Sequence, residues 1–151
     1  MGAHHTEAVD IDAEVLAPCS PAQLFPLVDD LGRYPEWNGL VARAEAQGDG
    51  SWAVDLRGRL GPLARTKRLR MVRAEHRVPE LAVFERAEHD GRDHSDWRLT
   101  ARVEAEGTGA RLRMTLHYDG GLFQPVVERL LRDEIERSRE RLLSLVAVDR
   151  T

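Results

Sequence analysis

Three side chains of this sequence could move a proton inside an apolar site: Lys67, Tyr118 and Glu134. Lys67 is the only lysine and shares strand parity with Leu69 and Met71. A lysine held among apolar groups has a lowered pKa and can act as a base or nucleophile, or anchor a polar ligand group. More commonly, such a lysine extends its stem toward water. We therefore predict no catalytic residue and keep these three as candidates only if a reaction occurs.

Residues 89–94 contain His89, Asp90, Asp93 and His94, whose nitrogen and oxygen atoms are metal-ligand types. Asp90-Gly91 is a hairpin signal and explains this polarity without a metal. The sequence also lacks a Ser/His/Asp arrangement and a Gly-rich phosphate loop. We predict no metal site and no cofactor.

The one dense basic run is Arg65-Thr-Lys-Arg-Leu-Arg-Met-Val-Arg73, which could meet phosphate groups of RNA or anionic lipid. The net charge of −4 argues against a dedicated nucleic-acid binder. We interpret the run as a solvated strand face balanced by carboxylates, and expect no specific nucleic-acid partner.

The 151 residues, 42% hydrophobic and 32% charged, are typical of one globular domain. We assign residues 1–8 to a disordered tail and residues 9–149 to the domain. Cys19 is the single cysteine, which excludes an internal disulfide. There is no signal-peptide core and no apolar stretch of ~18 residues that could span a membrane. We expect a cytoplasmic protein, monomeric or homodimeric.

The elements that must position these side chains begin with a strand over residues 9–15, where apolar and acidic residues alternate. Ala17-Pro18 ends it. Ser20 as N-cap, Pro21 at the first helical position and Gln23 at the third predict a helix with a capping box. This helix has an apolar face and should end at Gly32. Residues 34–38 should form a tight turn or short helix.

Six further strands are predicted, separated by turn residues: 40–46, 51–59, 65–77, 81–88, 96–105 and 111–118. Strict alternation with short turns indicates an antiparallel sheet with one solvated face. The order of strand, helical pair, six strands and a long helix predicts an α+β domain, with the last helix against the sheet.

The last helix is predicted from Leu122 to Val148, with apolar residues three and four apart. The apolar stripe contains Phe123, Val127, Leu130, Leu131, Ile135, Leu142, Leu145 and Val146. The charged face contains Glu128, Arg129, Arg132, Asp133, Glu136, Arg137, Arg139, Glu140 and Arg141. Glu134 and Ser138 lie at the edge of the stripe and, like Tyr118, could orient a ligand; Glu134 could equally belong to the charged face. A helix this one-sided needs a large apolar partner surface.

Three motifs resemble the SRPBCC superfamily, which includes START domains, birch-pollen-type allergens and polyketide cyclases/dehydrases. They are residues 17–25, residues 27–38 and Leu116-His-Tyr-Asp-Gly-Gly121. The resemblance implies a helix-grip fold: a curved antiparallel sheet of about seven strands around a long C-terminal helix, with a short helical pair after the first strand. It also implies an internal cavity for an apolar ligand, although this fold does not determine function.

The predicted ligand-binding residues are inward-facing strand residues together with one turn residue and one face of the last helix. They are Trp37, Trp52, Val54, Leu56, Leu69, Met71, Phe84, Trp97, Leu99, Met114, Leu116, Tyr118, Phe123, Val127, Leu131 and Ile135. Such a stripe more often fills a solid core; the resemblance favours a cavity. Trp37 and Asn38 could form its rim or simply anchor their turn.

We favour a binding module for a lipid, quinone or polyketide-like molecule. One alternative is a polyketide cyclase/aromatase-like enzyme that brings about an intramolecular aldol closure. Another is a ribosome- or quinone-associated interaction protein, in which Arg68 and Arg70 would contribute to binding.

Overall fold

Alternating apolar and polar residues form seven strands of one sheet, as the sequence predicts. The computed structural model describes residues 9–56, 67–119 and 124–149. In chain order the elements are β1 (Val9–Ala17), α1 (Pro21–Leu24), η1 (Phe25–Leu27), η2 (Leu31–Glu36), β2 (Val41–Ala46), β3 (Ser51–Leu56), β4 (Lys67–Arg77), β5 (Leu81–Arg86), β6 (Asp96–Glu106), β7 (Gly109–Asp119) and α2 (Gln124–Asp149). Each predicted strand segment overlaps one of the observed strands.

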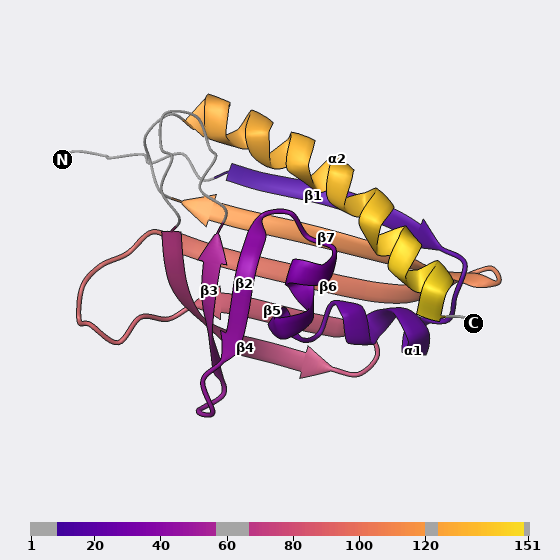
Figure 1. Cartoon of the computed structure of the whole chain (residues 1–151), viewed down its shortest axis with the longest axis horizontal. Helices are drawn as coiled ribbons and strands as arrows, with labels where there is room; N and C mark the ends of the chain where they lie inside the picture. Colours follow the sequence, from indigo (N-terminus) through magenta and orange to yellow (C-terminus); the bar gives the residue numbers. More distant parts are fainter. Residues whose placement is uncertain (1–8, 57–66, 120–123, 150–151) are drawn as a thin grey trace.

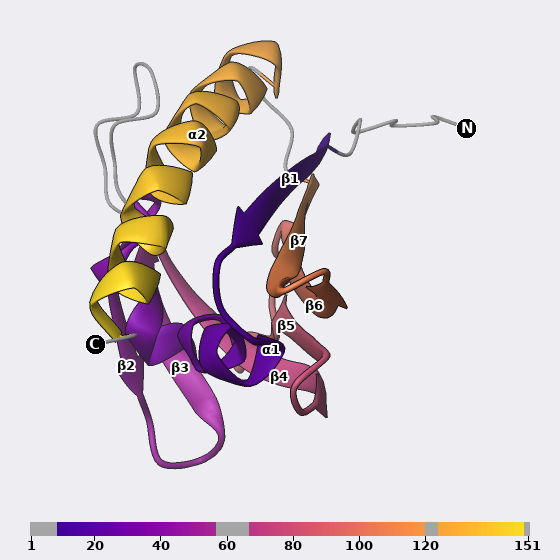
Figure 2. The same ribbon diagram turned by 90° about the vertical axis from the view of Figure 1, so that its right-hand side faces the viewer.

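The strands lie in the order β1-β7-β6-β5-β4-β3-β2, and every neighbouring pair is antiparallel. The sheet is curled, with β1 and β2 at its two edges (Figure 2). The long helix α2 crosses its concave side, and α1 lies near the C-terminal end of α2 (Figures 1 and 2). This arrangement is the helix-grip fold, which confirms the predicted fold class.

The helix predicted after Ser20 is much shorter than expected. Its capping box is present: the Gln23 amide donates to Ser20 Oγ at 3.2 Å, and the Ser20 amide to Gln23 Oε1 at 2.9 Å. The α-helix nevertheless ends at Leu24, because Pro26 has no N–H to continue the ladder and its ring crowds the preceding turn. The chain continues in two 3₁₀-helices. The predicted stop at Gly32 was therefore wrong, since Gly32 lies inside η2.

Among the α2 side chains that the structure describes, Leu131, Ser138, Leu142 and Val146 are buried. Their spacing of seven, four and four residues keeps them on one side of the helix. This side faces the sheet, which buries Leu131, Leu142 and Val146 of the predicted stripe and partly buries Ile135 and Leu145. In the described ranges, no helix has the length and hydropathy needed to cross a membrane.

The basic run on β4 is divided between the two faces of the sheet. On the outer face Arg68 Nε lies 2.7 Å from Asp55 Oδ1, and Arg70 Nη2 lies 3.3 Å from Asp49 Oδ2. Arg73 points the other way: its guanidinium carbon is 5.2 Å from the centroid of the Trp52 ring. The outer-face arginines thus have carboxylate partners, as expected for a balanced, solvated strand face.

Candidate functional site

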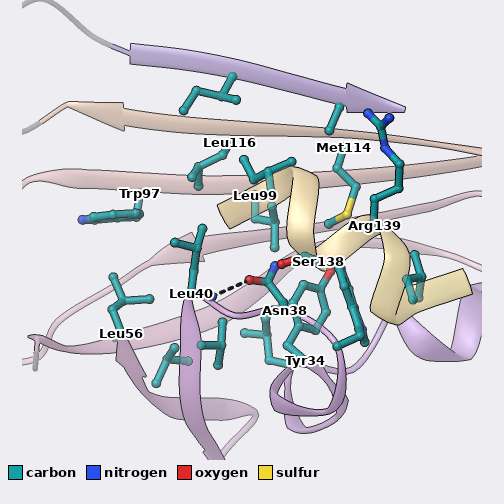
Figure 3. A pocket seen from close by; sticks show the side chains of 18 of the residues that line it. Tyr34, Asn38, Leu40, Leu56, Trp97, Leu99, Met114, Leu116, Ser138 and Arg139 are labelled. Atoms are coloured by element: carbon teal, nitrogen blue, oxygen red, sulfur yellow. Dashed lines mark hydrogen bonds between the residues drawn. The ribbon is translucent and has the colours of Figure 1, made fainter. Parts of the chain in front are cut away.

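An apolar cavity of about 90 Å³ lies between the concave face of the sheet and α2. Figure 3 labels ten of its residues, which come from the strands, from η2 and the turn after it, and from α2. The cavity is lined by Ile11, Ala13, Val15, Leu31, Tyr34, Trp37, Asn38, Leu40, Val41, Val54, Leu56, Leu69, Met71, Trp97, Leu99, Leu112, Met114, Leu116, Ile135, Ser138, Arg139 and Leu142. Such a surface favours an apolar occupant over water.

The strand register explains why these side chains share one surface. On neighbouring strands Val15 pairs with Leu112, Ala13 with Met114 and Ile11 with Leu116. Every second residue of a strand points to the same face, so these pairs form successive rows on the concave side. The rows continue onto β6, where Leu99 is paired with Leu116.

Trp97 ends this series of rows and packs against an aromatic side chain on the neighbouring strand. Its cross-strand partner is Tyr118, and the two ring centroids are 4.5 Å apart with the planes tilted by 41°. Trp97 lines the cavity, whereas Tyr118 is buried outside the lining. Tyr118 therefore holds the Trp97 indole in place instead of forming the wall itself.

Tyr34 and Trp37 bring the η2 segment against the cavity. The Tyr34 hydroxyl donates to the Val28 carbonyl at 2.8 Å, and Trp37 Nε1 donates to the Leu27 carbonyl at 2.9 Å. Burial, with contributions from Asp29 and Asp30, raises the pKa of Tyr34 far above its usual range. Its phenol is thus neutral and acts as a donor. Trp37 anchors its turn and lines the cavity, so the two roles weighed for it coexist.

Gly39 connects this turn directly to α2. Its amide donates to Ser138 Oγ at 3.0 Å, and the Ser138 hydroxyl donates to the Glu134 carbonyl at 2.8 Å. A Cβ on residue 39 would lie 1.4 Å from Glu134 Oε1 and 2.7 Å from Arg141 Nη1. Only glycine allows this approach without displacing those side chains. We call Gly39, Glu134 and Ser138 the α2 latch.

Asn38, Ser138 and Arg139 supply the amide, hydroxyl and guanidinium groups of a described lining that is otherwise aliphatic, aromatic or thioether. Asn38 Oδ1 accepts from the Leu40 amide at 2.9 Å (Figure 3). Arg139 Nη2 donates to Glu136 Oε1 at 3.1 Å, and its Nε is buried with no hydrogen-bond partner among the described residues.

The assignment of Arg139 to the charged face of the last helix was therefore wrong. Arg139 is four residues after Ile135 and three before Leu142, so the helical turn places it between two wall residues. A prediction based on hydrophobicity grouped Arg139 with the charged face because its side chain is charged. The spacing itself was the signal that could have identified it.

Most of the predicted ligand-binding residues lie on this one surface. Those that line the cavity are Trp37, Val54, Leu56, Leu69, Met71, Trp97, Leu99, Met114, Leu116 and Ile135. Trp52, Phe84, Tyr118 and Leu131 are buried in the core and are not among the lining residues. Phe123, and the side chain of Val127, lie outside the described residues.

Trp52 and Phe84 pack in a separate aromatic group. Their ring centroids are 5.6 Å apart, and that of Phe84 lies 6.2 Å from Tyr34. This packing occurs because the helical segment α1–η2 covers that part of the sheet. Strand parity alone could not distinguish the half of the sheet under α1–η2 from the half under α2.

The residues considered for proton transfer do not form one site among the described side chains. Glu134 is not part of the lining; its carboxylate lies 2.6 Å from Arg137 Nη2 and 3.3 Å from Arg141 Nη1. Burial, assisted by Asp119, raises the pKa of Tyr118, which keeps it protonated near neutral pH. Lys67 begins β4 opposite Leu56, and its side chain lies outside the described part.

The polar residues of the β5–β6 connection pair with one another. His94 Nε2 is 2.9 Å from Asp90 Oδ2, and His94 Nδ1 is 3.2 Å from Arg86 Nη2. Arg86 is mostly buried, and its Nε donates to Glu88 at 2.7 Å. Hydrogen bonds from Arg86 and the Arg70 backbone outweigh the effect of burial and lower the pKa of Glu88. In the described ranges, no three His, Cys, Asp or Glu side chains are grouped to hold a metal ion.

Comparison with known proteins places this geometry in a family. Residues 8–147 match the family described as polyketide cyclase / dehydrase and lipid transport. No curated protein matches the sequence.

Several solved structures share the fold at low sequence identity. A START superfamily protein from Mycobacterium smegmatis is 15% identical with a TM-score of 0.68, covering 93% of this chain and 97% of that one. A protein from Deinococcus radiodurans is 14% identical with a TM-score of 0.67, covering 89% and 97%. Ara h 8.0201 is 13% identical with a TM-score of 0.61, covering 94% and 99%. With the match over residues 8–147, these likenesses show that the chain belongs to the polyketide cyclase/dehydrase and lipid transport family of the SRPBCC superfamily.

Proposed function

We propose that this domain binds a hydrophobic small molecule, of lipid, quinone or polyketide-like character, in the cavity between the sheet and α2. The observation that carries the proposal is the lining itself, in which side chains from six strands, from η2 and the turn after it, and from α2 converge on one apolar space. Binding would be driven by removing the apolar surface of ligand and wall from water.

The size of the cavity constrains how binding occurs. At about 90 Å³ it is smaller than the ~150 Å³ engineered cavity that admits benzene, and far below the ~300–1,000 Å³ of sites for drug-sized ligands. A ligand of the proposed class must therefore widen the space between α2 and the sheet. Met71 and Met114 support such adaptation, since thioether side chains repack readily.

Binding is favoured over cyclisation as the proposed function. An aldol closure needs a proton-transfer pair at the ligand. Glu134 and Tyr118, two of the three residues considered for that role, lie outside the lining. Loss of turnover of a polyketide mimic in a Lys67→Ala, Tyr118→Phe variant would instead support the enzyme.

The test is binding of an uncharged fluorescent probe, N-phenyl-1-naphthylamine, together with native mass spectrometry of the purified protein. Ala13→Leu adds volume on the wall, whereas Ala53→Leu adds the same volume on the outer face beside Arg68 and Arg70. We expect probe binding that is weakened by Ala13→Leu and unchanged by Ala53→Leu. Equal effects of the two variants, or no probe binding by a folded protein, would overturn the proposal.

A further inference from the structure

We propose that the cavity selects amphipathic ligands carrying a carboxylate, and that Arg139 binds this carboxylate at the cavity mouth. The inference rests on the proposed function and adds a ligand class to it. Arg139 is the one charged side chain among the described residues that line the cavity.

Arg139 retains hydrogen-bonding capacity toward a ligand. Its side chain is 37% exposed, so it lies at the boundary between cavity and solvent. Nη2 is engaged with Glu136, but the buried Nε has no partner among the described residues. A buried N–H without an acceptor is costly, and a ligand oxygen would remove that cost. The planar guanidinium matches the two oxygens of a carboxylate.

The present partner of Arg139 is a weak competitor. Glu136 is three residues away on the same helix, and its side chain is 64% exposed. Exposed pairs of this type contribute little because water and salt screen them. When the apolar part of a ligand occupies the cavity, it would hold the ligand carboxylate at the Arg139 guanidinium. That carboxylate could share or replace the Glu136 contact.

The charged residue of the lining lies at one end of the cavity, and apolar residues lie at the other. Figure 3 shows Arg139 reaching from α2 toward the end of β1, while Trp97, Leu56 and Leu116 lie toward the opposite end. This separation suits a ligand with its charge at the mouth and its ring or acyl chain in the interior. A phosphate dianion fits less well, because it would bring a second negative charge beside Glu136.

The test compares matched acids and alcohols by displacement of N-phenyl-1-naphthylamine from the full-length protein. One pair has a ring, 2-naphthoate and 2-naphthalenemethanol; the other has a chain, decanoate and decanol, and the two pairs distinguish ring from acyl ligands. Each is measured on the wild type, Arg139→Gln, Arg139→Lys and the control Arg129→Gln. Arg129→Gln removes the same positive charge from α2 as Arg139→Gln does. The Arg129 side chain is exposed and lies outside the lining, so this variant controls for net charge.

We expect at least one acid to bind about tenfold more tightly than its alcohol, the factor typical of one charge-assisted hydrogen bond. Arg139→Gln should abolish this preference by weakening acid binding far more than alcohol binding, Arg139→Lys should retain part of it, and Arg129→Gln should leave it intact. Glu136→Gln should tighten acid binding severalfold.

Two results would overturn the inference in distinguishable ways. If the probe and the alcohols bind but acids have no advantage, or their advantage survives Arg139→Gln, the carboxylate assignment fails and the apolar cavity stands. If neither probe, acid nor alcohol binds to the folded protein, the proposed function fails as well. Should Arg139→Gln not fold, the Arg139→Lys and Glu136→Gln variants decide the matter by the direction of their effects on acid binding.

Discussion

Gly39 and Ser138 show how single residues fasten α2 to the turn after η2. The Gly39 amide is buried against the helix, and Ser138 Oγ satisfies it at 3.0 Å. The same hydroxyl donates to the backbone of its own helix, so one side chain serves both partners. The latch depends on a residue without Cβ at position 39 and a small hydroxyl at position 138.

Ser138→Ala should destabilise the protein by about 1–3 kcal/mol, because it leaves the buried Gly39 amide without its acceptor. Ser144→Ala is the matched control: its hydroxyl also donates to a carbonyl four residues back, but it is exposed. Surface changes of that kind stay within ~0.5 kcal/mol. Urea unfolding of both variants measures the difference, and equal losses would contradict the latch.

Gly39→Ala should cost about 1–3 kcal/mol, because the new Cβ displaces the Glu134 carboxylate. Removing that carboxylate should relieve the conflict. In a double-mutant cycle, Gly39→Ala with Glu134→Ala should therefore be less destabilising than the sum of the single changes by more than ~0.5 kcal/mol. Additive effects would show that the strain lies in the backbone instead.

At the scale of elements, the β2–β3 hairpin is held by Asp49. The Ser51 amide donates to Asp49 Oδ1 at 2.9 Å, and the Ser51 hydroxyl binds the same oxygen. The Ser51 hydroxyl, then its amide, and less strongly Arg70 lower the pKa of Asp49 from 3.8 to about 2. The turn is therefore strengthened by the ionised carboxylate.

Asp49→Asn should lower stability near neutral pH while keeping an oxygen to accept from Ser51. A carboxyl group with a lowered folded-state pKa stabilises the fold above its unfolded value, and this contribution is lost as pH falls through the folded value. The stability difference between wild type and Asp49→Asn should thus be full above about pH 4 and shrink steadily as the pH falls toward about 2. Urea unfolding between pH 2 and 6 measures it; an NMR titration midpoint for Asp49 at or above 3.8 would contradict it.

For the whole molecule, α2 both seals the core and forms one wall of the cavity. Leu142 is 1% exposed and belongs to the lining, so its packing opposes enlargement of the site. Leu24 is equally buried but lies outside the lining, in α1. Stability and ligand capacity are therefore coupled at positions on the wall and separate elsewhere.

Leu142→Ala and Leu24→Ala should each destabilise the protein by about 2–5 kcal/mol, since both remove fully buried side chains. Only Leu142→Ala adds volume to the cavity, so only this variant should bind N-phenyl-1-naphthylamine more tightly. Chemical unfolding and probe titration, both at a temperature where the variants are folded, measure the two effects. Tighter probe binding by Leu24→Ala would indicate general loosening instead of a local cavity.

The sequence by itself determined the seven strands, their antiparallel arrangement and the long final helix, because side-chain periodicity and turn residues are local signals. Most of the residues that it predicted for ligand binding do line the cavity, since parity along a strand is local too, but the β1 residues of the wall were not among them. Pro26 was a local signal that the prediction overlooked.

Only the tertiary structure decided which inward-facing residues border a cavity and which fill the core. Trp52 and Val54 have the same parity, yet Val54 lines the cavity and Trp52 packs against Phe84. The difference depends on which helical segment covers each part of the sheet. Likewise, Arg139 reaches the wall because α2 crosses the sheet near the end of β1, a contact between residues more than one hundred positions apart in sequence.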